Sequence, residues 1–357
     1  MHNKDHPPPQ FERPFDPLTT KLTGRFETSK AALSTKELFA ALESVQGTSR
    51  EWIYEQYDQR VGTQTVRDCS WSVGVVKLPS HRGLAIALGG RPHMMRLESR
   101  LGGFDAAFEP SLQLAAKGFE SIAATDCLNY GNPEEKQIMA EFVHSLAGLN
   151  DACKSLKMPI ISGNVSFYNQ TEGQNITSTP SVGVVGLKDS IHTPSQNFEA
   201  VGAPVFLVSQ AQVKTQGLWS DLLNQNESGQ GENWKPELWI SFLNQIRELA
   251  QLPEVECTRV VGKFGLGYTL AKMIQPEIGF EASSEQDWKN EILYQVIFVL
   301  KKGSDQNAFE AKIINAQIEK IGMTTKGTFK ISDITESCDS VINTYRTGWE
   351  KHFEELF

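Results

Sequence analysis

The sequence predicts an α/β protein, in the broad sense that includes α+β folds, with a domain boundary near residues 188–203. At 357 residues the chain is longer than a typical single domain. Two short apolar segments, 121–125 and 159–161, flank one long amphipathic segment, and this strand–helix–strand order is typical of α/β folds. A similar mixture of patterns returns after residue 200. We therefore expect one domain at 34–190 and a second at 200–357.

The N-terminal part combines a polar segment with two helix-start signals. Residues 1–33 are rich in proline and polar side chains, which predicts a flexible arm or linker. Ser34 and Glu37 form a capping box ahead of apolar residues at helical spacing. Thr48 and Glu51 repeat the capping pattern, which predicts a second, shorter helix.

The remaining elements follow from the spacing of apolar residues and from turn-forming residues. In the first domain, strands are expected at 70–78, 83–88, 121–125, 159–161 and 180–187, and helices at 105–118 and from Asn132 to about Leu156. In the second domain, strands are expected at 205–208 and 294–300, and helices near 236–250, 266–274 and 306–320. No internal repeat is visible.

Composition excludes several classes of function. The 34 basic and 43 acidic residues give a net charge of −9, and no run of Lys and Arg forms a basic patch, so nucleic acid is not an expected partner. No apolar run reaches the length needed to cross a membrane. Five scattered cysteines, an odd number without a CxxC pair, predict reduced thiols in a cytoplasmic protein.

Polar side chains cluster where two neighbouring strands are expected to end. One loop runs from Asp126 to Glu134, and the other from Ser162 to Asn169. Ligands commonly bind at the carboxyl ends of strands in such sheets. Asp126 offers a carboxylate, the backbone of Gly163 is open to a phosphate, Asn164 offers a hard oxygen suited to Mg²⁺, and Ser166 offers a hydroxyl. The alternative interpretation is that these residues simply form turns.

Other candidate motifs carry little chemistry. The glycines at 262, 265 and 267 are typical of a strand–helix turn, and the P-loop pattern is absent. The histidines show no recognisable catalytic spacing, with His93 expected in a polar connection and His144 on the solvated side of its helix.

At these two loops the chain resembles the phosphoribosylformylglycinamidine synthase family, in particular the C-terminal half of its synthetase subunit. Similar stretches occur at 52–58, 61–66 and 179–187, and their order fits the family from about residue 36 to the end. The resemblance implies an aminoimidazole ribonucleotide (AIR) synthetase-like N-terminal α/β domain followed by an AIR synthetase-like C-terminal α/β domain. It also implies a ligase that amidates formylglycinamide ribonucleotide with ATP in purine biosynthesis.

The resemblance further implies roles for four residues. Asp126 and Gly163 fall where the family contacts ATP, Asn164 on a Mg²⁺ ligand and Ser166 on a substrate contact. The expected cofactors are therefore ATP and Mg²⁺. No catalytic residue is expected in this chain, because the family's catalytic histidine belongs to the other half of the subunit. The expected partners are that N-terminal half, a glutaminase and the ribonucleotide substrate, or a second copy of this chain if it acts alone.

The chain also departs from the family pattern. Glu98-Ser99-Arg100 replaces an Asp-Pro-Tyr element, Gly89 lies near the place of an expected Asp, and residues 259–265 lack the acidic residues of the corresponding segment. A second, pseudo-symmetric nucleotide site on this half is therefore expected to be degenerate. Three hypotheses stay open: an enzyme half, a non-catalytic scaffold that completes the pseudo-dimer and docks the glutaminase, and a free-standing homodimeric enzyme.

Overall fold

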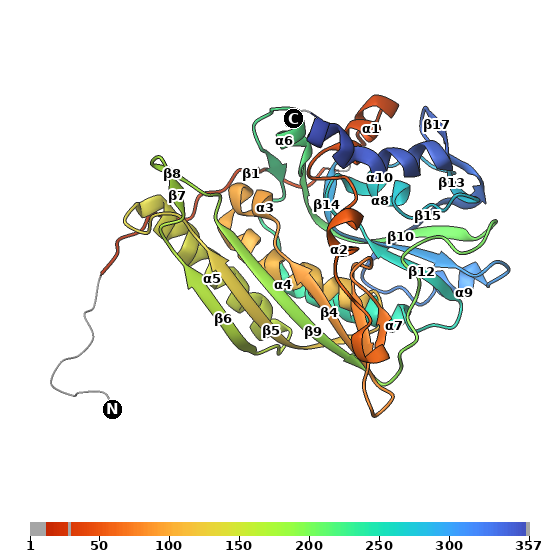
Figure 1. Ribbon diagram of the computed structural model, residues 1–357, viewed down its shortest axis with the longest axis horizontal. Helices are drawn as coiled ribbons and strands as arrows, with labels where there is room; N and C mark the ends of the chain where they lie inside the picture. Colours follow the sequence, from red (N-terminus) through yellow and green to blue (C-terminus); the bar gives the residue numbers. More distant parts are fainter. Residues whose placement is uncertain (1–11, 28–29, 355–357) are drawn as a thin grey trace.

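The computed structural model describes residues 12–27 and 30–354. A six-stranded sheet lies beside a nine-stranded sheet, and helices pack against both (Figure 1). A separate two-stranded hairpin consists of β7 (Gln170–Thr171) and β8 (Gln174–Asn175). This mixture confirms the predicted α/β class.

We call the part of the chain built on the six-stranded sheet the first domain and the part built on the nine-stranded sheet the second domain. The strand order of the six-stranded sheet is β2-β3-β4-β9-β5-β6, with bounds Thr65–Arg67, Gly74–Lys77, Gly83–Gly89, Thr179–Lys188, Glu120–Asn129 and Ile160–Ser166. Only β5 and β6 are parallel, and every other neighbouring pair is antiparallel. The two apolar strands recognised from their connecting helix are thus adjacent, while β9 pairs with the other side of β5.

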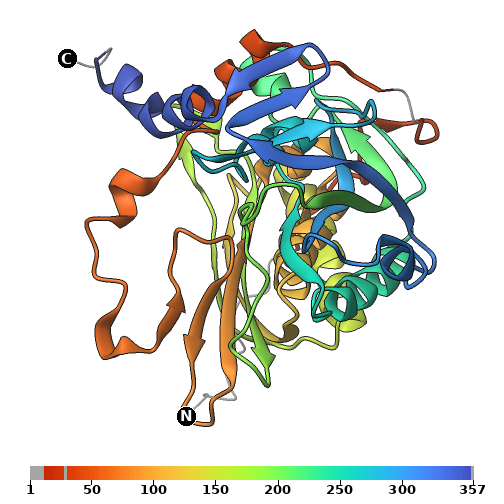
Figure 2. The ribbon, with the colours of Figure 1, turned by 90° about the vertical axis from the view of Figure 1, so that its right-hand side faces the viewer.

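Two long helices cover one face of this sheet, as Figure 2 shows in a view turned by 90°. They are α4 (Ser99–Ala115) and α5 (Lys136–Ser155), which cross closely because Gly103 and Gly148 lack side chains. A Cβ at Gly103 would lie 1.9 Å from the carbonyl oxygen of Ser145. In β4, Ala85 and Ala87 alternate toward the helices, while Ile86 and Leu88 face away and are 50% and 75% exposed. The sheet therefore has one buried and one open face.

The nine-stranded sheet belongs to the second domain. Its main path is β1-β11-β10-β15-β13-β16-β17, and β14 connects β10 to β12. The strands are β1 (Leu22–Thr23), β10 (Pro204–Thr215), β11 (Gly229–Gln230), β12 (Val255–Val260), β13 (Ile278–Ala282), β14 (Glu291–Leu300), β15 (Gln317–Lys326), β16 (Thr328–Ile331) and β17 (Ile334–Ser337).

The remaining helices are short, with two exceptions in the second domain. These two are α7 (Pro236–Leu249) and α10 (Cys338–Glu354). The others are α1 (Thr35–Glu43), α2 (Glu51–Tyr54), α3 (Pro92–Leu97), α6 (Trp219–Leu222), α8 (Gly265–Ala271), α9 (Gln306–Glu310) and a 3₁₀ turn, η1 (Val61–Thr63).

The helix-start predictions had mixed outcomes. The Ser34–Glu37 capping box is confirmed, with both reciprocal hydrogen bonds at the start of α1. The second capping box is wrong, because the hydroxyl of Thr48 donates to the carbonyl of Tyr345 instead. The Asn132 cap is also wrong: α5 begins at Lys136, and the Asn132 side chain accepts from the amide of Glu134. In both cases a competing contact uses the side chain.

The helix expected near 306–320 ends early, at Glu310. From Gln317 the chain pairs as β15 with β10 and β13, so sheet pairing to distant residues overrides the local helical pattern.

The N-terminal segment also joins the nine-stranded sheet. Within the predicted arm, residues 1–11 lie outside the described residues, but Leu22 is buried and β1 pairs in parallel with β11.

Aromatic side chains join the two domains between α4 and the nine-stranded sheet. Phe108 of α4 lies 4.6 Å, centre to centre, from the ring of Tyr294 on β14 and also contacts Trp239 of α7. The hydroxyl of Tyr294 donates to Asp105 of α4 at 2.7 Å. These aromatic residues belong to a continuous core that includes buried residues of both sheets.

Candidate functional site

Two of the four predicted site residues lie side by side on the parallel strands β5 and β6. Asp126 is the direct partner of Gly163 in the register of this pair. A Cβ at position 163 would lie 1.9 Å from Oδ1 of Asp126, so the carboxylate covers the backbone of Gly163. Only glycine leaves that space free without moving the carboxylate. The structure thus brings these two residues together.

Asp126 faces α5 and lies at the edge of an open hollow. The hollow, of about 630 Å³, is lined by Leu149, Cys153 and Met158, among other residues. Burial beside these apolar groups raises the pKa of Asp126, while a hydrogen bond from the backbone of Asn164 lowers it. The net shift of the pKa is upward, and among the described residues no charged side chain contributes to lowering it.

Asn164 and Ser166 lie on the opposite face of the same strand pair. Side chains alternate along β6, so residues 164 and 166 face away from α5 and residue 163 faces toward it. The register pairs Asn164 with Cys127, and both are exposed. Ser166 is half-buried, and its hydroxyl accepts a 3.0 Å hydrogen bond from Asn169. The four predicted residues therefore do not form one cluster within this chain.

The strands are longer than the sequence predicts. The strand expected to end at Asp126 continues to Asn129, and the strand expected to end near Gly163 continues to Ser166. The expectation that the polar residues lie beyond the strand ends is therefore wrong. The parallel pairing of β5 and β6 continues through these residues, with register partners from Thr125 and Ser162 to Asn129 and Ser166.

The residues around Asn164 do not by themselves make a magnesium site. Thr125, Ser162 and Ser166 share its face of the strand pair, and all of them are neutral. Among the residues that the structure describes, no group of three or more His, Cys, Asp and Glu side chains could hold a metal ion. Asn164 could supply one oxygen ligand, but the negative charge that Mg²⁺ needs would have to come from elsewhere.

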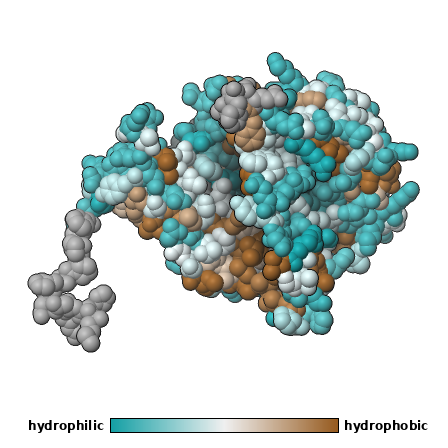
Figure 3. Space-filling model, in the orientation of Figure 1, coloured by the Kyte–Doolittle hydropathy of each residue, from teal (hydrophilic) through white to brown (hydrophobic). Residues whose placement is uncertain are grey.

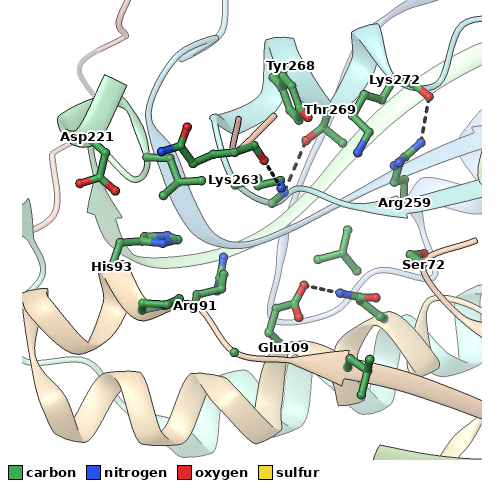
Figure 4. A pocket seen from close by; sticks show the side chains of 18 of the residues that line it. Ser72, Arg91, His93, Glu109, Asp221, Arg259, Lys263, Tyr268, Thr269 and Lys272 are labelled. Carbon is green, nitrogen blue, oxygen red and sulfur yellow. Dashed lines mark hydrogen bonds between the residues drawn. The ribbon is translucent and has the colours of Figure 1, made fainter. Parts of the chain in front are cut away.

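A cavity of about 610 Å³ lies between the two domains, away from the β5–β6 pair (Figure 4). The first domain contributes Arg91, His93 and Glu109, and the second contributes Arg259, Lys263 and Lys272. Sequence patterns alone do not reveal this site. The only available signal was the replacement of acidic by basic residues within 259–265.

An ion-pair network supports one wall of this cavity. His93, expected in a polar connection, is instead buried in α3, and its Nε2 lies 2.9 Å from Glu291 of β14. Arg91 contacts both Glu291 and Asp105. Burial alone would raise the pKa of Glu291, but Arg91 and His93 outweigh burial and lower it to about 2. The expectation for His93 is therefore wrong, because distant Glu291 satisfies its ring in the core.

Part of the first domain matches a known family model. Residues 72–188 match the family model described as AIR synthase related protein, N-terminal domain. This match includes both strands that carry Asp126 and Gly163. This part of the chain is therefore similar to an AIR synthase-related N-terminal domain, in agreement with the sequence resemblance.

Solved structures with a similar fold come from the bacterium Thermotoga maritima. Phosphoribosylformylglycinamidine synthase II is 20% identical over 77% of this chain, with a TM-score of 0.54. PurL in complex with AMPPCP is 18% identical over 84% of this chain (TM-score 0.55), and PurLQS is 18% identical over 90% (TM-score 0.54). This chain covers only 40%, 45% and 44% of those three chains, respectively.

Within 12–27 and 30–354, no helix is both long enough and apolar enough to cross a bilayer.

Proposed function

We propose that this chain is the C-terminal half of a split phosphoribosylformylglycinamidine synthase, which amidates formylglycinamide ribonucleotide at the expense of ATP. The observation that carries the proposal is the extent of the structural match. Up to 90% of this chain aligns with less than half of the T. maritima proteins. PurL from that bacterium has been solved in complex with ADP, with ATP and with FGAR. The resemblance of the two polar loops supports the same reaction.

In this proposal the free edge of the sheet is where ligands bind. β6 is the edge strand, and its residues 160–165 are exposed, so a ligand can contact both faces of the strand. Asp126 and Gly163 would contact the nucleotide on the α5 side, and Asn164 and Ser166 would contact metal and substrate on the open side. Phosphoryl transfer depends mainly on positioning and charge neutralisation. A partner must therefore supply the carboxylates and the catalytic histidine.

The open face of the six-stranded sheet supports the need for a partner half. Ile86 and Leu88 are exposed on this face, and the pairing through β9 and β5 places Asn164 on the same face. Figure 3 shows apolar side chains gathered in the lower part of the view, over this sheet. A partner that covers the apolar face would also approach Asn164. We propose the N-terminal synthetase half as this partner, with a glutaminase bound to the assembled complex as the source of ammonia.

Reconstitution tests this proposal. The chain is purified from its source cells under native conditions, and bound proteins are identified by mass spectrometry. We expect a synthetase half that carries the family histidine, together with a glutaminase. In the reconstituted complex, Asn164→Ala should abolish ATP-dependent amidation without unfolding the chain. Retained activity at saturating Mg²⁺ would contradict the role of Asn164.

A scaffold function is the second candidate, and the neutral surroundings of Asn164 favour it. In that case Asp126→Ala and Ser166→Ala would leave the rate of the complex unchanged, whereas deletion of residues 36–66 would weaken assembly. A rate loss of about tenfold from Asp126→Ala would exclude the scaffold. If the chain purifies alone and turns over ATP by itself, the free-standing homodimer becomes the better account.

A further inference from the structure

The interdomain cavity concentrates positive charge. Six arginine and lysine side chains line it. Arg91 and Arg96 are paired with carboxylates. The other four come from several elements: Arg259 at the end of β12, Lys263 before α8, Lys272 after α8, and Arg50 before α2. In Figure 4, Arg259, Lys263 and Lys272 lie along one side of the cavity, across from Glu109.

These four basic groups have no carboxylate partner among the described residues. Arg259 donates to the carbonyl of Lys272 at 3.0 Å, Lys263 to the carbonyl of Gln46, and Arg50 to the carbonyl of Thr48 at 2.7 Å. The ammonium of Lys272 lies 5.4 and 5.1 Å from the ring centres of Tyr268 and Tyr345. Carbonyls and ring faces orient a cation, but they do not neutralise its charge.

The acidic groups of the cavity are already engaged. Asp221 accepts two hydrogen bonds from Arg96, at 2.8 and 2.9 Å. Glu109 accepts from Gln113, and burial raises its pKa to about 7, so part of it is neutral. Glu291, which contacts two lining residues but does not itself line the cavity, is paired with Arg91 and His93. The cavity therefore carries a net positive charge and offers no free carboxylate group for a metal.

The basic groups also act on one another. Burial first, and then the charges of Lys272 and Arg50, lower the pKa of Lys263 to about 8. Burial, Arg259 and Arg50 lower the pKa of Lys272 to about 7. Half-buried like charges that face one space are unfavourable unless an anion is present to compensate them.

We propose that this cavity binds a small organic phosphate directly through Arg259, Lys263 and Lys272, without a divalent cation. Arginine and lysine side chains bind phosphate oxygens by charge-assisted hydrogen bonds. Leu88, Leu218 and Val260 add apolar wall for the organic part of the ligand. No residue of β5 or β6 lines the cavity, so this site is separate from the edge-strand site of the proposed function.

Calorimetric titration of the full chain tests this inference. The probes are ADP, ribose 5-phosphate and inorganic pyrophosphate, each in the presence of EDTA and again with Mg²⁺. We expect at least one probe to bind in EDTA. The double variant Lys263→Gln/Lys272→Gln should weaken that binding by about tenfold or more, because two charged hydrogen-bond donors are lost. Lys302→Gln, at an exposed lysine outside the cavity, is the matched control and should bind like wild type.

Several outcomes would overturn the inference. These are no binding of any probe in EDTA, equal binding by the double variant, or loss of binding in Asp126→Asn, which would assign the probe to the edge-strand site. Thermal unfolding provides a second measurement. The probe should raise the melting temperature of wild type, and this rise should vanish in the double variant. If the double variant does not fold, Lys263→Gln alone replaces it, with a smaller expected loss of affinity.

Discussion

The carboxylate of Asp126 occupies the space that any side chain at Gly163 would need. The two residues are register partners on parallel strands, and a Cβ at position 163 would come within 1.9 Å of Asp126 Oδ1. This relationship explains why a carboxylate and a glycine occur together here. The glycine lets the carboxylate rest on the strand, where a ligand at the free edge can reach it.

Gly163→Ala should displace the Asp126 carboxylate. In the reconstituted complex we expect nucleotide affinity to fall about tenfold, equivalent to about 1.4 kcal/mol. The melting temperature should change little, because β6 is an exposed edge strand. Gly74→Ala is the matched control, since its Cβ would meet no atom closer than 3.9 Å. Unchanged nucleotide affinity in Gly163→Ala would show that Asp126 does not contact the nucleotide.

Glu291→Gln should destabilise the chain in a pH-dependent way. Removing this buried carboxylate leaves His93 without its partner and Arg91 with Asp105 alone, at a cost of about 3–5 kcal/mol at pH 7. The pKa of Glu291 is lowered to about 2, so its stabilisation is complete above pH 4.5 and is lost as the pH falls from 4.5 toward 2. Urea unfolding of wild type and variant at several pH values measures the difference. A difference that does not shrink in acid would contradict this account.

For Glu109→Gln, the difference in stability from wild type should depend on pH in the opposite sense. Burial raises the pKa of Glu109 to about 7, so the folded state holds its proton longer than the unfolded state does. Wild-type stability should therefore fall as the pH rises from 4.5 through 7, and the neutral variant should avoid this loss. The variant should be the more stable protein at pH 8, by up to about 3 kcal/mol. Equal stabilities at pH 5 and pH 8 would refute the shifted pKa.

Leu88→Asp should weaken association with the partner half. Leu88 is 75% exposed on the open sheet face, so the substitution should leave the fold of the isolated chain intact. Burying a charge in an apolar interface should reduce affinity by about tenfold or more. Ile314→Asp is the control, because Ile314 is 66% exposed outside the six-stranded sheet. Sedimentation analysis of the mixed halves measures the affinity, and equal binding by both variants would place the partner elsewhere.

Local patterns predicted many elements of the fold correctly. The Ser34–Glu37 capping box and the long amphipathic helix depend on neighbours in the chain, and the sequence shows them, as it does the strands observed at 83–89 and 179–188. Those two strands, predicted at 83–88 and 180–187, also pair with distant residues, but their alternating apolar residues are visible in the sequence itself. The strand at 317–326 follows a segment with a helical pattern, and its pairing with distant residues decides its structure.

The sequence by itself determined that Asp126 and Gly163 lie on neighbouring strands, because one helix connects two short apolar segments. Tertiary structure decided the rest of the site. Side chains alternate along β6, so Asn164 lies on the face opposite Asp126. Local patterns predicted a strand that ends before Asn164, whereas β6 continues to Ser166. Domain packing brought Arg91 of one domain to Glu291 of the other, and gathered Arg259, Lys263 and Lys272 around one cavity. Such contacts join residues far apart in the chain, so only the folded arrangement specifies them.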